Sequence, residues 1–161
     1  MRPGVRLGVD VGKARVGIAS SDRDGLLATP VATLARQDAD RRSFGILVEE
    51  YAPIEIVVGL PISLSGADTA STTDAREFAA EVAEWVSLPV RLVDERLSTV
   101  SAQRALRDSG RRTKGSRPVI DQVAAVIILQ NALDSERSAG RPPGALVGSE
   151  SGVDPSSSTD R

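Results

Sequence analysis

The stretch Gly8–Ala19, GVDVGKARVGIA, decides the fold of this chain. Apolar residues alternate with small or polar ones over residues 5–11, which predicts a β-strand with Gly8 and Asp10 on one face. A glycine turn leads into a second alternating run over residues 15–20, which predicts a hairpin. One face of both strands carries unusually small side chains, so we expect another element to pack closely there.

Asp10 stands at the apparent end of the first strand and is followed by Lys13 and Arg15. An Asp in such a hairpin can be an ordinary turn residue. Here it is flanked by Val9 and Val11, and a carboxylate buried among apolar neighbours is costly unless it is paired or holds a cation. We therefore take Asp10 as a candidate catalytic residue and metal ligand, with Lys13 and Arg15 as candidate phosphate-binding residues.

The composition limits the chemistry that the chain can perform. With 161 residues and 40% hydrophobic content, we expect one globular domain with its own core. The chain has no Cys and no His, which excludes disulfides, thiolate sites, Ser-His-Asp triads and imidazole ligands. Any metal would be held by oxygen, which favours Mg²⁺ or Mn²⁺.

The apolar runs and the aromatic content exclude two further classes. No apolar run reaches the roughly 20 residues of a membrane span, and no signal peptide precedes the first strand, so we expect a cytoplasmic protein that binds no membrane. Aromatic residues make up only 2% of the chain and lie in helical patterns. A base-stacking platform of the single-strand-binding kind is therefore not expected.

The order of periodic segments predicts an α/β fold. Besides the hairpin, strands are expected at residues 26–34, 54–60 and 90–93, and helices at 44–51, 71–85, 98–109 and 119–133. This order indicates a mixed five-stranded sheet, in which antiparallel hairpin strands are followed by parallel strands and flanked by helices. We expect residues 1–138 to form this domain and residues 139–161, rich in Gly, Pro and Ser, to form a disordered tail.

A second acid, Glu95, directly follows the strand expected at residues 90–93. Functional residues of open α/β sheets gather at the carboxyl ends of strands. Asp94 is a competing candidate, and a solvated turn with a local ion pair to Arg96 is the simpler alternative.

A third acid, Asp121, lies in the first turn of a strongly apolar helix and shares a face with Ala124 and Ala125. This small face matches that of the first two strands, so helix and sheet could approach closely and bring Asp121 toward Asp10. The alternative is an acid favoured by the helix dipole.

Asp10, Glu95 and Asp121 together are the candidate catalytic and metal-binding residues. Metal-assisted phosphodiester cleavage uses hard oxygen ligands that hold two cations roughly 4 Å apart, and it requires no histidine. Asp10, central in the sheet, would bridge the two cations, and the other two acids would complete the site.

Four motifs, GVDVGKARVGIA, VVGLP, DERLST and IDQVAAVIILQ, resemble in order those of the YqgF/RuvX family. The match spans residues 5–133. It implies a ribonuclease H-like three-layer fold and a metal-dependent nuclease, described in the family as processing the 5′ end of pre-16S ribosomal RNA and, earlier, as a Holliday junction resolvase. The acidic residues of the family fall on Asp10, Glu95 and Asp121. Ser63 and Ser65 are departures, because relatives often have Asn and an acid there.

Six cations crowd one segment although the net charge is −2: Arg104, Arg107, Arg111, Arg112, Lys114 and Arg117. Because the segment precedes Asp121, it is a candidate phosphate-contacting arm, with a solvated charged face as the alternative. The candidate substrate-binding residues are Lys13, Arg15, Arg96, Ser98, Lys114 and Arg117.

The sequence thus predicts a hydrolase that processes structured RNA in ribosome biogenesis, with ribosomal precursor particles as partners. Cleavage of four-way DNA junctions and a non-catalytic RNA-binding module are the alternatives. An ATPase of the actin and sugar-kinase type would need a second lobe and a second Asp-x-Gly-Thr-like loop, and neither is present in the sequence. The choices between RNA and DNA and between monomer and homodimer stay open.

Overall fold

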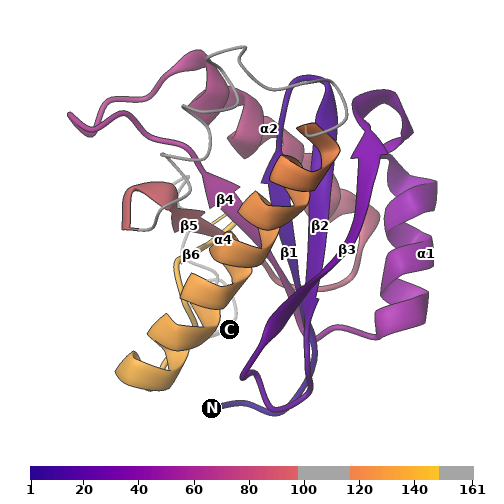
Figure 1. Ribbon diagram of the computed structural model, residues 1–161, viewed down its shortest axis with the longest axis vertical. Coiled ribbons are helices and arrows are strands. Elements are labelled where there is room, and N and C mark those ends of the chain that lie inside the picture. Colours follow the sequence, from indigo (N-terminus) through magenta and orange to yellow (C-terminus); the bar gives the residue numbers. More distant parts are fainter. Residues whose placement is uncertain (98–116, 149–161) are drawn as a thin grey trace, which may run out of the picture.

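A mixed sheet of six strands lies at the centre of the molecule, in the order β3-β2-β1-β4-β5-β6 (Figure 1). The computed structural model describes residues 1–97 and 117–148, without the side chains of Leu97 and residues 117–121. The strands are β1 (Arg6–Val11), β2 (Arg15–Ser21), β3 (Ala28–Ala35), β4 (Glu55–Leu60), β5 (Val90–Asp94) and β6 (Ala145–Leu146). The helices are α1 (Arg41–Tyr51), α2 (Ala70–Trp85) and α4 (Arg117–Ala139), with short 3₁₀ helices η1 (Arg36–Asp38) and η2 (Glu95–Leu97).

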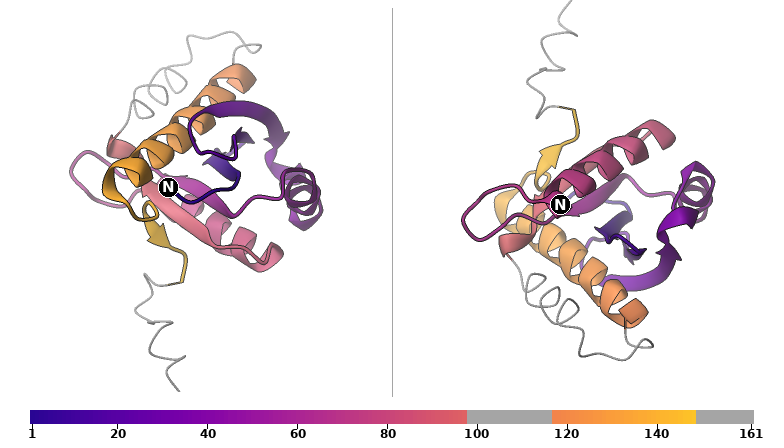
Figure 2. Two further views of the ribbon diagram at one scale, coloured as in Figure 1. Left: turned by 90° about the horizontal axis from the view of Figure 1, so that it is seen from below. Right: turned by 90° about the horizontal axis from the view of Figure 1, so that it is seen from above.

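The first three strands form an antiparallel meander, and β4 and β5 extend it in parallel with β1. Helices α1 and α2 cover one face of the sheet, and α4 covers the other (Figure 2). The predicted three-layer α/β arrangement is therefore confirmed. The helix expected at residues 98–109 lies outside the described residues.

The strand count differs from the predicted five, because residues 139–148 were expected to belong to a disordered tail. Instead, Ala145 and Leu146 pair antiparallel with β5 as β6. The next residue, Val147, donates its backbone N–H to Val90 O at 2.8 Å and packs against the core. Gly144, with φ +67°, makes the close approach possible, because a Cβ there would collide with the carbonyl of Leu92. Residues 149–161 lie outside the described part.

Side-chain capping starts α1 and α2. Asp40 accepts a hydrogen bond from Ser43 N at 2.9 Å, and Thr69 accepts one from Thr72 N at 3.3 Å. Both are reciprocal capping boxes, which satisfy amide groups that the first helical turn leaves without partners. Within the described residues, no helix combines the length and apolar character that a membrane span requires.

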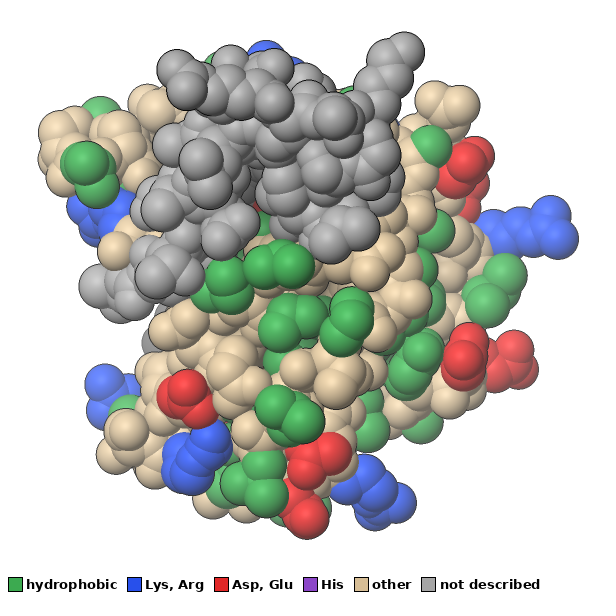
Figure 3. Space-filling model, in the orientation of Figure 1, with side chains coloured by type: hydrophobic (Ala, Val, Ile, Leu, Met, Phe, Trp, Pro, Cys, Tyr) green, Lys and Arg blue, Asp and Glu red, His purple; other side chains and the backbone are tan. Residues whose placement is uncertain are grey.

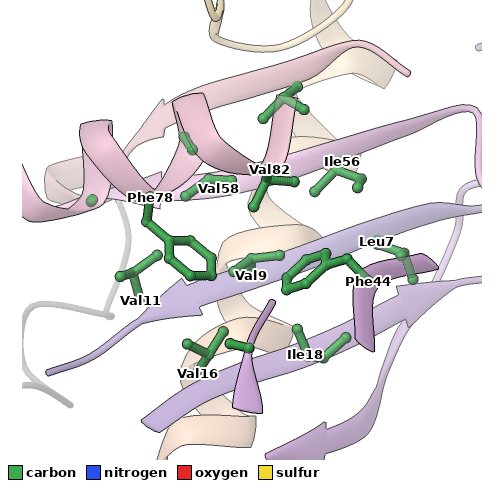
Figure 4. Close-up of a cluster of buried hydrophobic side chains, with 14 of the residues drawn as sticks. Leu7, Val9, Val11, Val16, Ile18, Phe44, Ile56, Val58, Phe78 and Val82 are labelled. Atoms are coloured by element: carbon green, nitrogen blue, oxygen red, sulfur yellow. The ribbon is translucent and has the colours of Figure 1, made fainter. Parts of the chain in front are cut away.

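Large side chains fill the space between the sheet and helices α1 and α2. Phe44 and Phe78 meet edge to face with ring centroids 5.9 Å apart, and Trp85 lies 5.6 and 5.8 Å from the two rings. Figure 4 shows the two phenylalanine rings lying above β1, with Val9 between them. The aromatic residues of the helices therefore pack in the core.

Small side chains separate the sheet from α4. A Cβ added at Gly8 would lie only 2.7 Å from Leu129 Cβ and 3.1 Å from the carbonyl oxygen of Ala125. The close approach expected from the small face of the hairpin is thus confirmed. Seen from this side, hydrophobic side chains also remain at the surface (Figure 3), and Val123 on α4 is 39% exposed.

Candidate active site

Asp10 is a buried carboxylate near the end of the central strand β1, only 1% exposed. Its neighbours Val9 and Val11 belong to the core under α1 and α2. Since successive side chains of a strand point to opposite faces, Asp10 points to the α4 face. On that face it lies next to Gly17, its partner on β2.

Glu95 is the second buried carboxylate of this face, at 3% exposure. It is the first residue of η2, directly after β5. Its Oε2 lies 2.5 Å from the position that a Cβ on Gly59 would occupy. Gly59 belongs to β4, the strand between β5 and β1, so the carboxylate of Glu95 extends across β4 in the direction of the strand that carries Asp10.

Asp94 points elsewhere and forms a local ion pair. Arg96 donates to Asp94 from its side chain, with Nη2 and Oδ2 2.6 Å apart, and from its backbone N at 2.9 Å. These hydrogen bonds hold the pKa of Asp94 below its usual value. The ion pair considered for this turn therefore exists between Asp94 and Arg96. The Glu95 carboxylate instead lies over Gly59 on the α4 face of the sheet.

The backbone of α4 brings position 121 toward the same end of β1. Glu136 near the end of α4 contacts Arg6 at the start of β1, and Ala125 lies above Gly8, so the helix runs opposite to the strand. Four residues before Ala125 correspond to about 6 Å along a helix, close to the two-residue rise from Gly8 to Asp10. The side chain of Asp121 is outside the described part, so its role stays a prediction. Within the described residues, no three acids meet closely enough to hold a metal ion.

Three of the predicted substrate-binding residues are described by the structure, and they lie in segments that follow β1 and β5. Lys13 is exposed in the β1–β2 turn, and Arg15 begins β2 half-buried. Arg96 lies beside the loop after β4, with Nη1 3.3 Å from the Cβ position of Gly66. The side chain of Arg117 and all of Ser98 and Lys114 are outside the described part.

Arg36 supports the glycine turn, and sequence reasoning missed it. It donates two hydrogen bonds to Asp74, at 2.8 and 3.0 Å, and one to the carbonyl of Gly12 at 2.7 Å. Its guanidinium also lies 4.9 Å from the centre of the Phe78 ring. The hydrogen bonds from Arg36 lower the pKa of Asp74. An arginine after a strand carries no sequence signal for such a role.

Ser63 and Ser65 stabilise the loop after β4. Ser63 and Ser65 are hydrogen-bonded through their hydroxyls at 2.9 Å, and the Ser63 hydroxyl donates to the carbonyl of Ala67 at 3.0 Å. Gly66 closes the turn with φ +90° and donates to Ser63 O at 2.8 Å. These serines therefore hold the loop by contacts within it.

The sheet topology defines an α/β protein with a ribonuclease H-like fold, and two buried acids lie on the α4 face of its sheet. The fold is similar to that of T. thermophilus RuvC in complex with a Holliday junction substrate, with a TM-score of 0.52 at 14% identity, covering 86% of this chain and 98% of RuvC. At that identity the likeness concerns the fold alone.

Sequence comparison identifies the family. A model of the RuvX family, described as a Holliday junction resolvase, matches residues 4–135. A protein of Clavibacter michiganensis named "Putative pre-16S rRNA nuclease" is 61% identical over 91% of this chain and 93% of its own length. A protein of Streptomyces coelicolor with the same name is 56% identical, over 91% and 90%. The chain belongs to the RuvX family, which confirms the resemblance found in its motifs and makes it a nuclease, a hydrolase of phosphodiester bonds.

Proposed function

We propose that this protein is a metal-dependent nuclease that processes the 5′ end of pre-16S ribosomal RNA. The observation that carries the proposal is the placement of Glu95. Its carboxylate crosses above Gly59, on the sheet face where Asp10 is buried and toward which α4 brings position 121. The relatives named as pre-16S rRNA nucleases support RNA as the substrate.

The acids of this site fit a hard divalent cation. Asp10 and Glu95 offer carboxylate oxygens from neighbouring parts of one face, and the chain contains no His or Cys that would favour a softer metal. We assign Asp10, Glu95 and Asp121 as the residues that would hold Mg²⁺ or Mn²⁺. When bound, two such cations would supply an activated water and stabilise the leaving oxygen.

The surrounding residues orient the substrate. Lys13 and Arg15 lie in and after the turn that follows Asp10, where they can contact phosphates of the bound strand. Arg36, which is paired with Asp74, holds this turn through the Gly12 carbonyl. The backbone that carries the Lys13 and Arg15 side chains is therefore fixed. Arg96, Ser98, Lys114 and Arg117 remain proposed as substrate contacts on the basis of sequence.

Cleavage of four-way DNA junctions is the second candidate function. It is favoured by the family description, which names a Holliday junction resolvase. A nuclease-like module that binds RNA without cutting it is the third, and the burial of two of the acids on one face argues against it.

A cleavage assay with two substrates tests the proposal. Precursor 16S rRNA and a four-way DNA junction would be incubated with the full chain in Mg²⁺, in Mn²⁺ and in EDTA. We expect cut RNA in either metal, none in EDTA, and slower or no resolution of the junction. Preferential junction cleavage would establish the second function, and binding without cutting in every condition would establish the third.

Thermal melting tests the metal site without relying on activity. Because a ligand that binds only the folded state stabilises it, Mg²⁺ or Mn²⁺ is expected to raise the melting temperature of the wild type. Glu95→Gln should abolish the rise. Asp24→Asn, a change at an exposed acid in the β2–β3 turn, is the matched control and should keep it.

A further inference from the structure

A cavity of about 380 Å³ opens beside Glu95, between α4, β5 and the segment that leads into β6. Its walls are mostly aliphatic and include Val93, Ile128, Ala132 and Pro143. Cavities of this volume with apolar walls are the usual sites of small flat ligands and groups. Because Glu95 belongs to the lining, the cavity is continuous with the candidate active site.

Polar groups at the cavity come from α4 and from the end of β5. Asn131, Ser135 and Ser138 lie on α4, together with Asp134, and Asp94 lies opposite on β5. Among the residues that the structure describes, the lining includes no Lys or Arg. Asp94 and Asp134 are paired with Arg96 and Arg137, which do not line the cavity. The described walls therefore present aliphatic groups and hydrogen-bonding oxygens rather than cations to a ligand.

Among the carboxylates of the lining, Asp134 retains capacity to accept a hydrogen bond. Asp134 accepts from Gln130 at 3.2 Å and from Arg137 at 2.7 Å, both through Oδ1. A carboxylate has about four acceptor sites, so Oδ2 can also accept from a ligand. Flat apolar rings that carry N–H donors at one edge match such a cavity, and nucleobases with exocyclic amines are rings of this kind.

We propose that this cavity binds one unpaired base of the substrate strand, next to the phosphodiester held at Asp10 and Glu95. The inference rests on the proposed nuclease function. The ring lies between Val93, Ile128 and Pro143, and its exocyclic amine donates to Asp134. Adenine, guanine and cytosine carry such an amine and uracil does not. The cavity therefore favours these three bases over uracil at the position that flanks the cleaved bond.

Single-turnover cleavage of short precursor RNAs tests this. Each nucleotide near the cleaved bond is replaced in turn by an abasic unit, and the wild type is compared with Ser135→Leu, which fills the cavity from an exposed helical position. We expect one abasic position to slow the wild type about tenfold, the usual worth of one well-bound base. The same position should have no further effect in Ser135→Leu, because the base has already lost its site.

Two variants complete the design. Ser87→Leu places the same side chain on an exposed residue between α2 and β5, and it should behave as wild type. Asp134→Ala should remove the preference for cytosine over uracil at the sensitive position. The proposal is overturned if no abasic position slows cleavage by the wild type. It is also overturned if the abasic unit slows Ser135→Leu by the same factor as it slows the wild type.

A binding measurement separates this proposal from the proposed function. An RNA carrying 2-aminopurine at each position in turn is titrated with Asp10→Asn, in which binding is followed without cleavage. One position should change its fluorescence on binding, and adding Ser135→Leu should abolish the change. If the wild type cleaves no RNA, the proposed function fails, but the fluorescence change still shows whether the cavity binds a base. Absence of the signal at every position refutes base binding even if cleavage occurs.

Discussion

The two faces of the central sheet are built from different side chains although they share the same strands. On the α1–α2 side, β1 and β4 contribute Leu7, Val9, Val11, Ile56, Val58 and Leu60. On the α4 side, the same strands contribute Arg6, Gly8, Asp10, Glu55, Val57 and Gly59. One face is thus uniformly large and apolar, whereas the other is charged at both ends and small in the middle. The first serves stability, and the second brings a helix close and leaves room for carboxylates.

The charged ends of the α4 face differ from each other. At the amino ends of the parallel strands, Glu136 bonds to Arg2 at 2.8 Å and to Arg6 at 3.2 Å, and Glu55 bonds to Arg2 at 3.0 Å and to Arg91 at 2.9 Å. These ion pairs hold the buried carboxylates Glu55 and Glu136 and anchor the end of α4. At the carboxyl ends, the face instead gathers the acids Asp10 and Glu95.

The largest expected effect is on the cleavage rate, and it should differ between two neighbouring residues of β1. Asp10→Asn should lower the single-turnover cleavage rate by about 10³-fold or more, because it removes the proposed bridging carboxylate, while the fold stays intact. Val9→Ala, one residue earlier on the other face, should leave the rate per folded molecule unchanged and lower the free energy of unfolding by about 2 kcal/mol. If Asp10→Asn cuts RNA at the wild-type rate, the site assignment is wrong.

The large-residue face should show the greatest stability loss. Phe44 is fully buried and contacts both Phe78 and Trp85. Phe44→Ala is expected to lower the free energy of unfolding by about 3 to 5 kcal/mol in urea denaturation. Ile46→Ala on the same helix changes a side chain that is 55% exposed, and it should stay within about 0.5 kcal/mol of wild type. Similar losses in the two variants would contradict the assignment of this core.

The ion pairs at the amino ends predict a pH dependence. Hydrogen bonds from Arg2 lower the pKa of Glu136 to about 2. Since this pKa is depressed by folding, the stabilisation is present above the ordinary carboxyl pKa of 4.5 and is lost as the pH falls toward 2. Glu136→Gln should lower stability at pH 7 by about 3 kcal/mol and flatten the decline between pH 5 and 2. An acid titration followed by circular dichroism measures both, and an unchanged slope would show that Glu136 is not responsible.

The smallest expected effects are on stability, and they should differ in sign between a glycine in a crowded position and one in open space. Gly59→Ala should cost about 1 to 3 kcal/mol, because its Cβ would lie 2.5 Å from both Glu95 Oε2 and Ile128 Cδ1. It should also slow cleavage by displacing Glu95. Gly45 on α1 has no atom within 4 Å of its Cβ position, so Gly45→Ala should stabilise the protein by about 0.5 to 1 kcal/mol. Melting curves and cleavage rates of the two variants test the contrast, and normal activity in Gly59→Ala would refute the positioning of Glu95 by this glycine.

Much of this arrangement could be predicted from local sequence. The alternation around Asp10 predicted which residues of β1 share a face, and the small residues of α4 predicted its close approach. The strand that ends before Glu95 was also predicted correctly. These features follow from the two-residue period of a strand and the 3.6-residue period of a helix, which are written into neighbouring residues.

Other features required the tertiary structure. The choice between Glu95 and Asp94 depends on Gly59, a residue of another strand that leaves space for one carboxylate. Strand β6 forms because Gly144 fits against Leu92, and its Gly-rich and Pro-rich surroundings carry no strand pattern.

The sequence by itself determined the family and the order of the elements from β1 to β5, and it predicted the acids that we propose for the candidate site. Only the tertiary structure decided which charges pair, as in the contact of Arg2 with Glu136, 134 residues away along the chain. The physical reason is that periodicity assigns a side chain to a face, whereas its partner depends on which elements packing brings opposite that face. The cavity beside Glu95 exists for the same reason, since α4, β5 and the residues before β6 each supply only part of its wall.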